Sequence, residues 1–189
     1  MQAEQVSFDD EPLILVNTND EILGHQDKAS CHDGQGILHR AFSVFIFNAQ
    51  GEVLLQQRTK QKRLWPEIWA NTCCSHPRKN EETLKAALRR LQEEVGLNAD
   101  LTFLYKFEYH ASYADKGSEH ELCSVFVGLS DDSPQINNNE IADTRYIKAE
   151  ELDALLQKNP EHYSPWLHLE WAELRTNRWE AIENILIQN

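Results

Sequence analysis

Short apolar runs separated by turn-forming residues dominate much of the chain. The runs predict β-strands at residues 13–16, 41–47, 53–57, 102–111, 121–129 and 144–147. The run AFSVFIF at residues 41–47 is the strongest, and the turn sequence at residues 48–51 predicts that the next run folds back beside it. Turn-forming residues 17–20 likewise predict a hairpin that pairs residues 13–16 with residues 21–24.

One stretch follows the helical period. Within residues 81–95, apolar side chains recur at steps of four, three and four, namely Leu84, Leu88, Leu91 and Val95. This spacing predicts an amphipathic helix with one apolar stripe, and Gly96 predicts its C-terminal stop. A shorter helix is expected at residues 150–157, and the pair Ser164-Pro165 is typical of the start of a further helix.

The order of these elements indicates the fold class. Strands come first, an amphipathic helix lies in the middle and helices end the chain, which predicts an α+β protein with a mixed sheet. The 189 residues suit one domain, and the chain has no internal repeat, low-complexity linker or shift in composition. We expect a single domain over residues 1–189, with a core at about residues 37–150 and a helical part at about residues 150–189.

The chain is strongly acidic, with 31 Asp and Glu against 18 Lys and Arg and a formal net charge of -13. This charge repels nucleic acids and anionic membrane surfaces, so neither is an expected partner. A phosphate-bearing ligand would need metal ions or a local basic patch, and residues 58–63 carry most of the local positive charge. No apolar run approaches the roughly 20 residues that span a bilayer, and the acidic start lacks the features of a signal peptide.

The cysteines favour a reducing compartment. Of the four Cys, Cys73 and Cys74 are adjacent, and nothing else in the sequence indicates secretion. We therefore expect a cytoplasmic protein with reduced thiols. The absence of a coiled-coil pattern predicts a monomer.

Three His and two Glu form a candidate metal site, namely His32, His39, His76, Glu119 and Glu121. The period of a strand places Glu119 and Glu121 on one face, in line with apolar residues, where two carboxylates without a counterion would be costly. A divalent cation held by these carboxylates and three neutral imidazoles would remove that cost, and such ligands suit Zn, Mn, Fe or Mg. The alternative is a set of unrelated surface residues, because the spacings are long and irregular.

Other residues could carry chemistry or be purely structural. Cys74 lies two residues before His76, which suits an activated thiol or a metal pair, but also a structural loop with buried small residues. Arg90 and Glu94 share a helical face, although most such pairs are ordinary solvated ion pairs. Tyr109 and Trp166 could line a pocket or belong to the core, and a Trp face can stabilise a cation.

The spacing of the helix and its preceding loop resembles the Nudix box, G-x5-E-x7-R-E-U-x-E-E-x-G-U. The matching residues are Glu81, Arg89, Glu93, Glu94 and Gly96. Two positions differ from the box: Ser75 replaces the leading Gly, and Arg90 replaces the Glu of the Arg-Glu pair. In Nudix hydrolases that Glu helps to hold the metal used for the attack of water on a diphosphate. A positive charge at this position disfavours hydrolysis and favours binding of an intact diphosphate.

The chain resembles one branch of the Nudix superfamily over roughly residues 13–170, the type I isopentenyl-diphosphate isomerases. The motifs that carry this resemblance are His32-x6-His39-Arg40-Ala41-Phe42-Ser43, Trp65-Pro66 with Trp69, Asn71-Thr72-Cys73-Cys74-Ser75-His76-Pro77, Tyr109, Glu119-His120-Glu121 and Ser164-Pro165-Trp166. The resemblance implies a Nudix-like mixed sheet between helices, with additional N-terminal strands and C-terminal helices. It also implies the interconversion of isopentenyl and dimethylallyl diphosphate through a tertiary carbocation.

The resemblance assigns roles to individual residues. It makes His32, His39, His76, Glu119 and Glu121 the ligands of a tightly bound metal, Mn²⁺ or Zn²⁺. Cys74 and Glu121 become the catalytic pair, with Tyr109 beside Glu121. Glu94 and the backbone carbonyl of Cys74 become ligands of a second metal, Mg²⁺, which bridges to the substrate diphosphate. The basic residues implied around that diphosphate are Lys28, Arg58, Lys62 and Arg90, and Trp166 matches the aromatic residue over the isoprenoid tail.

Two other functions remain open at this point. A Nudix-type diphosphate hydrolase would use the same metal sites, and Arg90 is the residue that argues against it. A metal-stabilised binding module would keep the metal ligands without any need for Cys74, Tyr109 and Glu121 to meet. The remaining residues of interest are expected to be structural or at the surface, and they are His25, Cys31, His110, His120 and His168.

Overall fold

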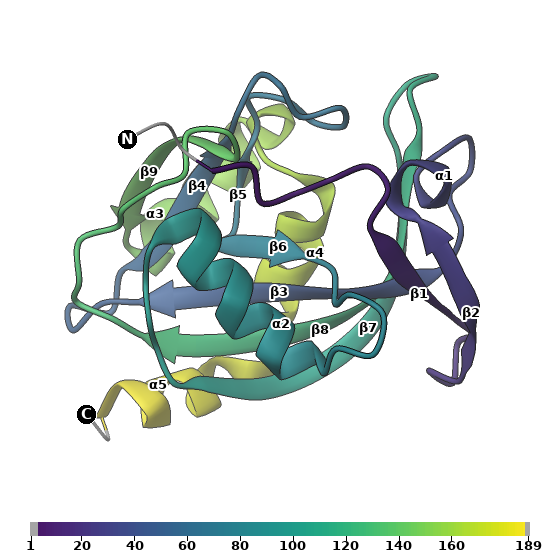
Figure 1. Cartoon of the computed structure of the whole chain (residues 1–189). Helices are drawn as coiled ribbons and strands as arrows, with labels where there is room; N and C mark the ends of the chain where they lie inside the picture. Colours follow the sequence, from purple (N-terminus) through teal and green to yellow (C-terminus); the bar gives the residue numbers. More distant parts are fainter. Residues whose placement is uncertain (1–3, 188–189) are drawn as a thin grey trace.

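A twisted mixed sheet organises the computed structural model, which describes residues 4–187 (Figure 1). Its centre is formed by β3 (His39–Phe47) and β8 (Ser118–Leu129), which run parallel to each other. β7 (Leu101–Ser112) pairs with β8 and β6 (Cys73–Ser75) pairs with β3, both antiparallel. The parallel pairing of β3 and β8 brings residues that are about 80 positions apart into direct register.

Shorter strands extend the sheet at both ends of β3. At one end, β1 (Pro12–Val16) and β2 (Ile22–Asp27) form a hairpin, and Leu15 of β1 pairs with His39 of β3. The short helix α1 (Lys28–Cys31) follows the hairpin. At the other end β4 (Val53–Arg58) pairs with β5 (Trp69–Ala70) and β9 (Ile141–Ile147).

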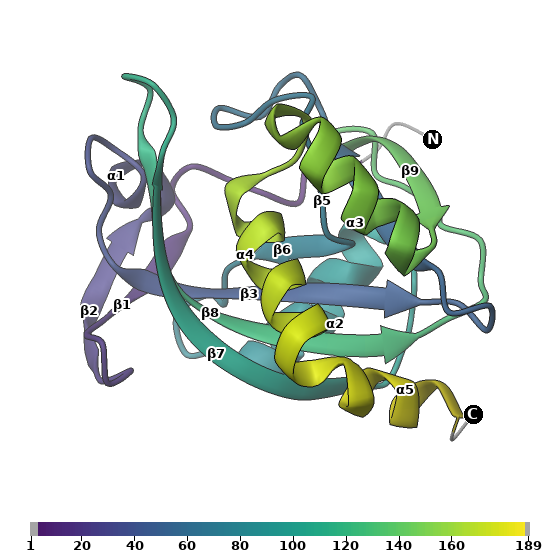
Figure 2. The same ribbon diagram turned by 180° about the vertical axis from the view of Figure 1, so that it is seen from behind.

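Helices cover both faces of the sheet. On one face lies α2 (Thr83–Arg90), which continues as the π-helical turn η1 (Leu91–Val95). The other face carries α3 (Ala149–Lys158), the short 3₁₀ turn η2 (Pro160–His162), α4 (Pro165–Glu173), the π-helical turn η3 (Leu174–Arg178) and α5 (Trp179–Ile187) (Figure 2). Because β3 is buried on both sides, its side chains alternate between two hydrophobic cores, one on each face of the sheet. Phe42 and Val44 pack towards α2, and Phe45 and Phe47 pack towards the C-terminal helices.

The predicted α+β class and the six predicted strands are confirmed, with small differences at their ends. The hairpin at the start of the chain is confirmed too, although its second strand runs to Asp27. The strands β5 and β6 and the helix α1 were not predicted. Each is only two to four residues long, too short for any periodicity to show. Among the described residues, no helix is both long and apolar enough to cross a membrane.

The predicted amphipathic helix exists, but only the second half of the predicted stripe, Leu91 and Val95, is buried. The helix begins at Thr83 instead of residue 81, and Leu84 and Leu88 are 42% and 38% exposed. The buried residues of this helix are Ala86, Ala87, Arg90, Leu91, Glu94 and Val95. The small Ala side chains let the backbone approach the sheet, and the ion pair of Arg90 with Glu94 satisfies two polar groups inside the core. The predicted stop is confirmed, since Gly96 adopts a left-handed conformation with φ of 70°.

The start of α4 was predicted correctly. The side chain of Ser164 accepts a hydrogen bond from the backbone N–H of Leu167 (3.3 Å), and Pro165 occupies the first helical position. This cap fixes where the helix begins. It therefore fixes the places of Trp166 and Glu170, which lie one turn apart and are both buried.

The buried carboxyl group of Glu170 should make the free energy of unfolding depend on pH. This group is fully buried and accepts a hydrogen bond from the Cys123 thiol (3.6 Å), and burial raises the pKa of Glu170 from 4.5 to about 8. Between these two pH values the native state holds a proton that the unfolded state has lost. The free energy of unfolding contributed by this group therefore falls as pH rises, by up to about 1.4 kcal/mol per pH unit.

We expect Glu170→Gln to remove this slope, because the amide does not ionise. Urea unfolding at pH 5.5 and 7.5 measures it, and Glu173→Gln, which changes a partly exposed carboxylate at the end of the same helix, is the control. The variant should gain stability relative to the parent protein as pH rises. The same pH slope in Glu170→Gln as in the parent protein would contradict the expectation.

Candidate active site

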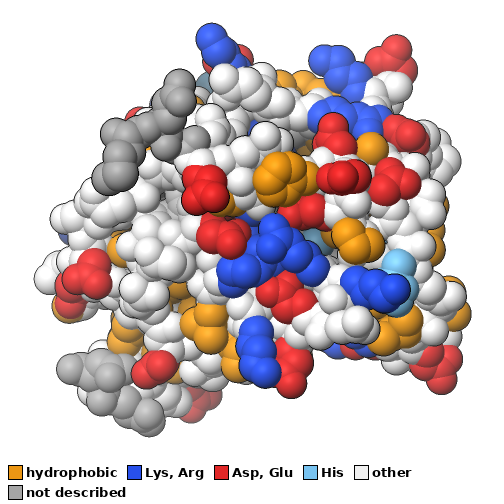
Figure 3. All heavy atoms as spheres, in the orientation of Figure 1, with side chains coloured by type: hydrophobic (Ala, Val, Ile, Leu, Met, Phe, Trp, Pro, Cys, Tyr) orange, Lys and Arg blue, Asp and Glu red, His pale blue; other side chains and the backbone are white. Residues whose placement is uncertain are grey.

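A cavity of about 280 Å³ contains most of the candidate functional residues. Its walls hold four of the five predicted metal ligands and, beyond them, Cys74, Tyr109 and Trp166. The other candidate residues that line it are basic, namely Lys28, Arg58, Lys62 and Arg90. Lys and Arg side chains gather near the centre of one face of this acidic protein, with Asp and Glu side chains around them (Figure 3). The structure thus supplies the local basic patch that a phosphate-bearing ligand would need.

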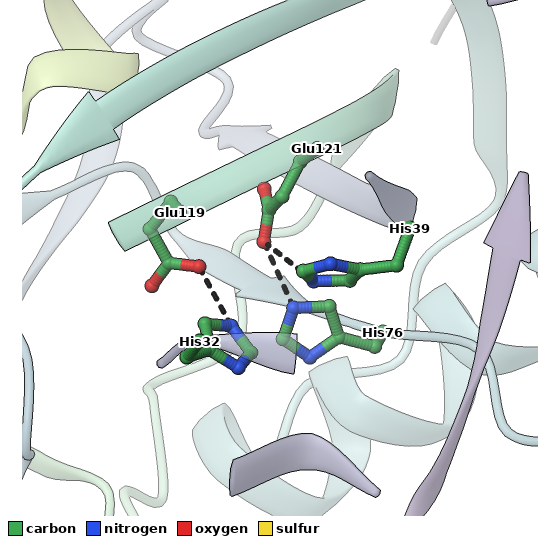
Figure 4. Close-up of side chains that lie close together, drawn as sticks. All are labelled: His32, His39, His76, Glu119 and Glu121. Atoms are coloured by element: carbon green, nitrogen blue, oxygen red, sulfur yellow. Dashed lines mark hydrogen bonds and ion pairs between the residues drawn. The ribbon is translucent and has the colours of Figure 1, made fainter. Parts of the chain in front are cut away.

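The five candidate metal ligands point toward one another (Figure 4). One ligand atom from each lies within 4.8 Å of the others, in the set His32, His39, His76, Glu119 and Glu121. They come from different parts of the chain: His32 ends α1, His39 opens β3, and His76 follows β6. Register explains one of these encounters, because His39 is the direct partner of Glu121 across the parallel strands. The convergence contradicts the alternative that these are unrelated surface residues.

Two of the imidazoles are held in the orientation that metal binding requires. His32 Nδ1 lies 2.7 Å from the carbonyl of Lys28, and His39 Nδ1 lies 2.6 Å from the carbonyl of Ile37. Since a carbonyl only accepts, each Nδ1 donates and, in the neutral ring, leaves Nε2 with a free lone pair. Within residues 4–187, Nε2 of His39 has no hydrogen-bond partner although it is buried. Nitrogen lone pairs facing carboxylate oxygens fit a divalent cation between them.

Burial and charge set the protonation of this cluster. Burial and the neighbouring His32 lower the pKa of His39 to about 3, so its ring is neutral, as a ligand must be. Burial opposes a charge on His32 as well, but Glu119, 2.7 Å away, raises the pKa of His32 above its ordinary value. Burial and the charge of Glu119 raise the pKa of Glu121. Two carboxyl groups this close cannot both ionise without a cation, which again fits a metal.

Cys74 and Cys73 point to opposite sides of the sheet because they are neighbours in the strand β6. Cys74 lines the cavity, and Cys73 is fully buried in the core beneath α2. The guanidinium of Arg58 approaches the Cys74 sulfur to 3.9 Å. Burial nevertheless raises the pKa of Cys74 to about 12, so the group is a neutral thiol at neutral pH.

Tyr109 and Trp166 complete this part of the cavity. The hydroxyl of Tyr109 donates to Glu121 Oε2 (2.7 Å), because the two residues face each other across β7 and β8. The indole N–H of Trp166 donates to Asn71 Oδ1 (3.1 Å). Asn71 was part of a motif but received no role in the sequence analysis, and its position shows that it orients the Trp166 ring.

The predicted basic residues divide into two groups. Lys28, Lys62 and Arg90 line the same cavity, and burial together with the charges of Lys62 and Arg90 lowers the pKa of Lys28. Arg58 is held differently, since its guanidinium donates to the carbonyls of Trp65 (3.0 Å) and Leu64 (3.1 Å) and lies over the Trp166 ring.

Arg90 and Glu94 are not a solvated pair. They are 3% and 2% exposed, and Arg90 Nη2 lies 2.6 Å from Glu94 Oε1. The interpretation of Arg90 and Glu94 as an ordinary solvated ion pair is therefore wrong. Sequence reasoning also missed Glu140, which lines the cavity and pairs with Lys62. It stands in a polar loop, and nothing in its local sequence distinguishes it from other surface acids.

His120 and His110 lie outside the cluster, as expected, and the alternation of side chains along β8 accounts for the position of His120. They face each other across β7 and β8, and His120 Nε2 approaches Glu108 (3.3 Å) on the outer side of the pair.

A side chain at position 117 should affect both the stability of the fold and metal binding. The φ of Gly117 is 142°, and a Cβ there would lie 2.2 Å from the carbonyl oxygen of His32. We expect Gly117→Ala to destabilise the fold by about 1–3 kcal/mol through backbone strain, and to weaken metal binding by displacing His32. Gly24→Ala is a matched control, because a Cβ at Gly24 meets nothing within 4 Å. Urea unfolding and titration with Mn²⁺ measure the two effects, and equal behaviour of both variants would contradict the expectation.

Comparisons with known proteins agree with this architecture. Residues 37–169 match the family model of the NUDIX domain. A crystal structure of a Deinococcus radiodurans protein shares the fold, with a TM-score of 0.66 and 22% identity over 79% of this chain and 90% of that one. The MutT protein from Methanosarcina mazei also shares it, with a TM-score of 0.59 and 16% identity over 72% of this chain and 91% of that one.

Relatives with similar sequences identify the family more narrowly than the shared fold does. The chain is 41% identical over 174 residues to Isopentenyl-diphosphate Delta-isomerase 1 of Photorhabdus laumondii, covering 91% of this chain and 99% of the relative. It is 42% identical over 171 residues to Isopentenyl-diphosphate Delta-isomerase of Serratia proteamaculans, covering 90% and 95%. The chain therefore belongs to the isopentenyl-diphosphate Delta-isomerase family within the NUDIX superfamily.

Proposed function

We propose that this protein is an isomerase that interconverts isopentenyl diphosphate and dimethylallyl diphosphate in isoprenoid biosynthesis. The observation that carries the proposal is the meeting of Cys74, Tyr109 and Glu121 in one cavity with a group of cations. A binding module would need the cations and the metal ligands, but it would not need a buried thiol and a carboxyl group beside the same space.

The reaction moves a double bond by two proton transfers. The substrate gains a proton at C4 and loses one at C2, with a tertiary carbocation between the two steps. Cys74 and Glu121 are the groups that give and take these protons, one on each side of the allylic unit. A positioned acid or base typically contributes about 10²–10⁴-fold to the rate. Tyr109 holds Glu121 through its hydroxyl and so fixes the carboxyl group against the substrate.

Trp166 protects the carbocation. Its ring lines the cavity and is 2% exposed, so it can both face a cation and exclude water. A desolvated cation over a Trp face is stabilised by about 2 kcal/mol. Excluding water is equally important, because water would trap the carbocation as an alcohol. The contact of Arg58 with the same ring and with Cys74 keeps both side chains in place.

Two metal sites are part of the proposal. The cluster of three His and two Glu would hold Mn²⁺ or Zn²⁺, and its donors fit such an ion. Glu94 and the backbone carbonyl of Cys74 would hold Mg²⁺ together with the diphosphate. When bound, these ions neutralise the buried carboxylates and the phosphate oxygens. Lys28, Lys62 and Arg90 bind the diphosphate and so position the reacting carbons.

A hydrolytic Nudix activity is not supported. Arg90 stands where the hydrolases carry a carboxylate, and its guanidinium engages Glu94 directly. That arrangement favours binding of an intact diphosphate. We further propose that the protein works in the cytoplasm, which its four free thiols support, and that it is a monomer.

Product analysis tests the proposed function. Purified protein with Mg²⁺ and isopentenyl diphosphate should yield dimethylallyl diphosphate, detected by NMR, with no release of phosphate. Chelation of metals should stop the reaction. Release of phosphate or diphosphate at ordinary enzymatic rates, without the isomer, would contradict the proposal and favour a hydrolase.

A further inference from the structure

A carboxylate lies among the basic side chains of the cavity. Glu140 is 4% exposed and precedes β9 directly. Its Oε2 atom pairs with Lys62 Nζ and lies 3.6 Å from Arg90 Nη2. Burial opposes its charge, but these two cations lower the pKa of Glu140, so the group is ionised at neutral pH.

The backbone holds Glu140 firmly in this place. Its N–H donates to the carbonyl of Asn137 (2.9 Å), and its carbonyl accepts from the N–H of Thr59 (3.1 Å). Asn137 in turn donates its N–H to the carbonyl of Glu94 (2.8 Å). The loop that carries Glu140 is therefore tied both to the end of β4 and to the helical turn that carries Glu94.

The balance of charge in the cavity favours a further cation once a diphosphate is bound. Lys28, Lys62 and Arg90 supply three positive charges, and Glu94 and Glu140 supply two negative ones, so the group has a net charge of +1. A diphosphate monoester is more negative than the roughly −2 of a phosphate monoester. The cations alone cannot neutralise it, and Glu140 would face the phosphate oxygens as a like charge. A divalent cation between the carboxylate and the phosphates would turn this repulsion into attraction.

We infer that Glu140 is a ligand, directly or through a water molecule, of the divalent cation that enters the cavity with the diphosphate. Mg²⁺ in such sites uses one or two carboxylates together with substrate phosphates, and Glu94 and Glu140 supply two. The inference rests on the proposed function and deepens it, because it adds a residue to the diphosphate end of the same cavity. The ion pair with Lys62 then keeps Glu140 in position before the cation arrives.

A purely positioning role for Glu140 makes a different prediction. If Glu140 only aligned Lys62 and Arg90, its loss would weaken diphosphate binding whether or not Mg²⁺ is present. If Glu140 binds the cation, its loss should weaken binding only when Mg²⁺ is present. Without Mg²⁺ the neutral variant should bind the anion as well as the parent protein or better, because a like charge has been removed.

Calorimetric titration with inorganic pyrophosphate distinguishes the two roles without any turnover. The parent protein and Glu140→Gln, both with metal at the His and Glu cluster, are titrated with and without Mg²⁺. We expect Glu140→Gln to lose at least tenfold in affinity with Mg²⁺ and none without it. Glu140→Asp keeps the charge and should retain most of the Mg²⁺ dependence. Asp153→Asn, in a separate ion pair with Arg175, is the control and should behave like the parent protein.

An equal loss of affinity with and without Mg²⁺ in Glu140→Gln would overturn the inference, and so would an unchanged Mg²⁺ dependence. Circular dichroism of each variant establishes that it is folded, and an unfolded Glu140→Gln leaves the decision to Glu140→Asp. An equal loss of affinity with and without Mg²⁺ in Glu140→Asp would then overturn the inference. Failure of the proposed function would look different, because the parent protein itself would form no isomer.

Discussion

Replacing Cys74 with alanine should lower kcat by about two to four orders of magnitude, because it removes one of the two groups that we propose exchange protons with the substrate. Cys74 lines the cavity beside Arg58 and is a neutral thiol at neutral pH. The KM for isopentenyl diphosphate should change little, since in our proposal the side chains that bind the diphosphate are those of other residues. Steady-state kinetics measure both constants, and thermal unfolding should show that the fold persists.

Cys73→Ala is the matched control for this experiment. Cys73 is the same residue type one position earlier, but it is buried beneath α2 on the opposite side of the strand. Its replacement should cost some stability, because it leaves a small cavity in the core, while kcat stays near that of the parent protein. A fully active Cys74→Ala protein would contradict the role of Cys74. Loss of activity in Cys73→Ala alone would show that its neighbour had been chosen wrongly.

Glu121→Gln should have an effect at least as large, because we propose two roles for this carboxyl group. It exchanges a proton with the substrate, and it is a ligand of the metal at the His and Glu cluster. It accepts from the Tyr109 hydroxyl (2.7 Å) and lies 2.8 Å from His76 Nε2. The amide keeps the size of the side chain but can neither accept a proton at ordinary pH nor neutralise a metal. We expect kcat to fall by at least about 10³-fold, near the range for loss of a positioned acid or base.

Metal affinity gives a second measurement on the same variant. Removing even an outer partner of a metal ligand typically costs about 10- to 100-fold in affinity, so loss of a direct ligand should cost more. Competition with a chelator measures this. Glu108→Gln, on the neighbouring strand and on the outer side, is the control and should leave activity and metal affinity unchanged. A Glu121→Gln protein with normal metal affinity would contradict the role of Glu121 as a ligand.

The parts of the fold that follow a local period could be predicted from the sequence. The apolar run at residues 41–47 is short, rich in aromatic and β-branched residues and followed by a turn sequence, which favours a buried strand, and it forms most of β3. The alternation of Glu119, Glu121 and Cys123 placed both carboxylates on one face, and the structure has them so. The convergence of the His residues could not be derived from spacing, because it depends on the register between β3 and β8 for His39, and on the positions of α1 and β6 for His32 and His76.

Other features depend on partners that are distant in the sequence. Two members of the predicted stripe, Leu84 and Leu88, are exposed, whereas the ion pair of Arg90 with Glu94 on the same helix is buried. Such a pair looks like a surface pair until its surroundings are known. Glu140 has a polar local sequence, and its partner Lys62 is 78 residues away. Neither hydrophobic periodicity nor a short motif contains that information.

Incorporation of deuterium from solvent tests the central claim most directly. Purified protein with Mg²⁺ converts isopentenyl diphosphate in deuterated water, and NMR locates the label in the product. A proton added at C4 predicts deuterium in a methyl group of dimethylallyl diphosphate, which chelation or Cys74→Ala should abolish. Formation of the isomer without deuterium in that methyl group, or no isomer from folded and metal-loaded protein, would contradict the account.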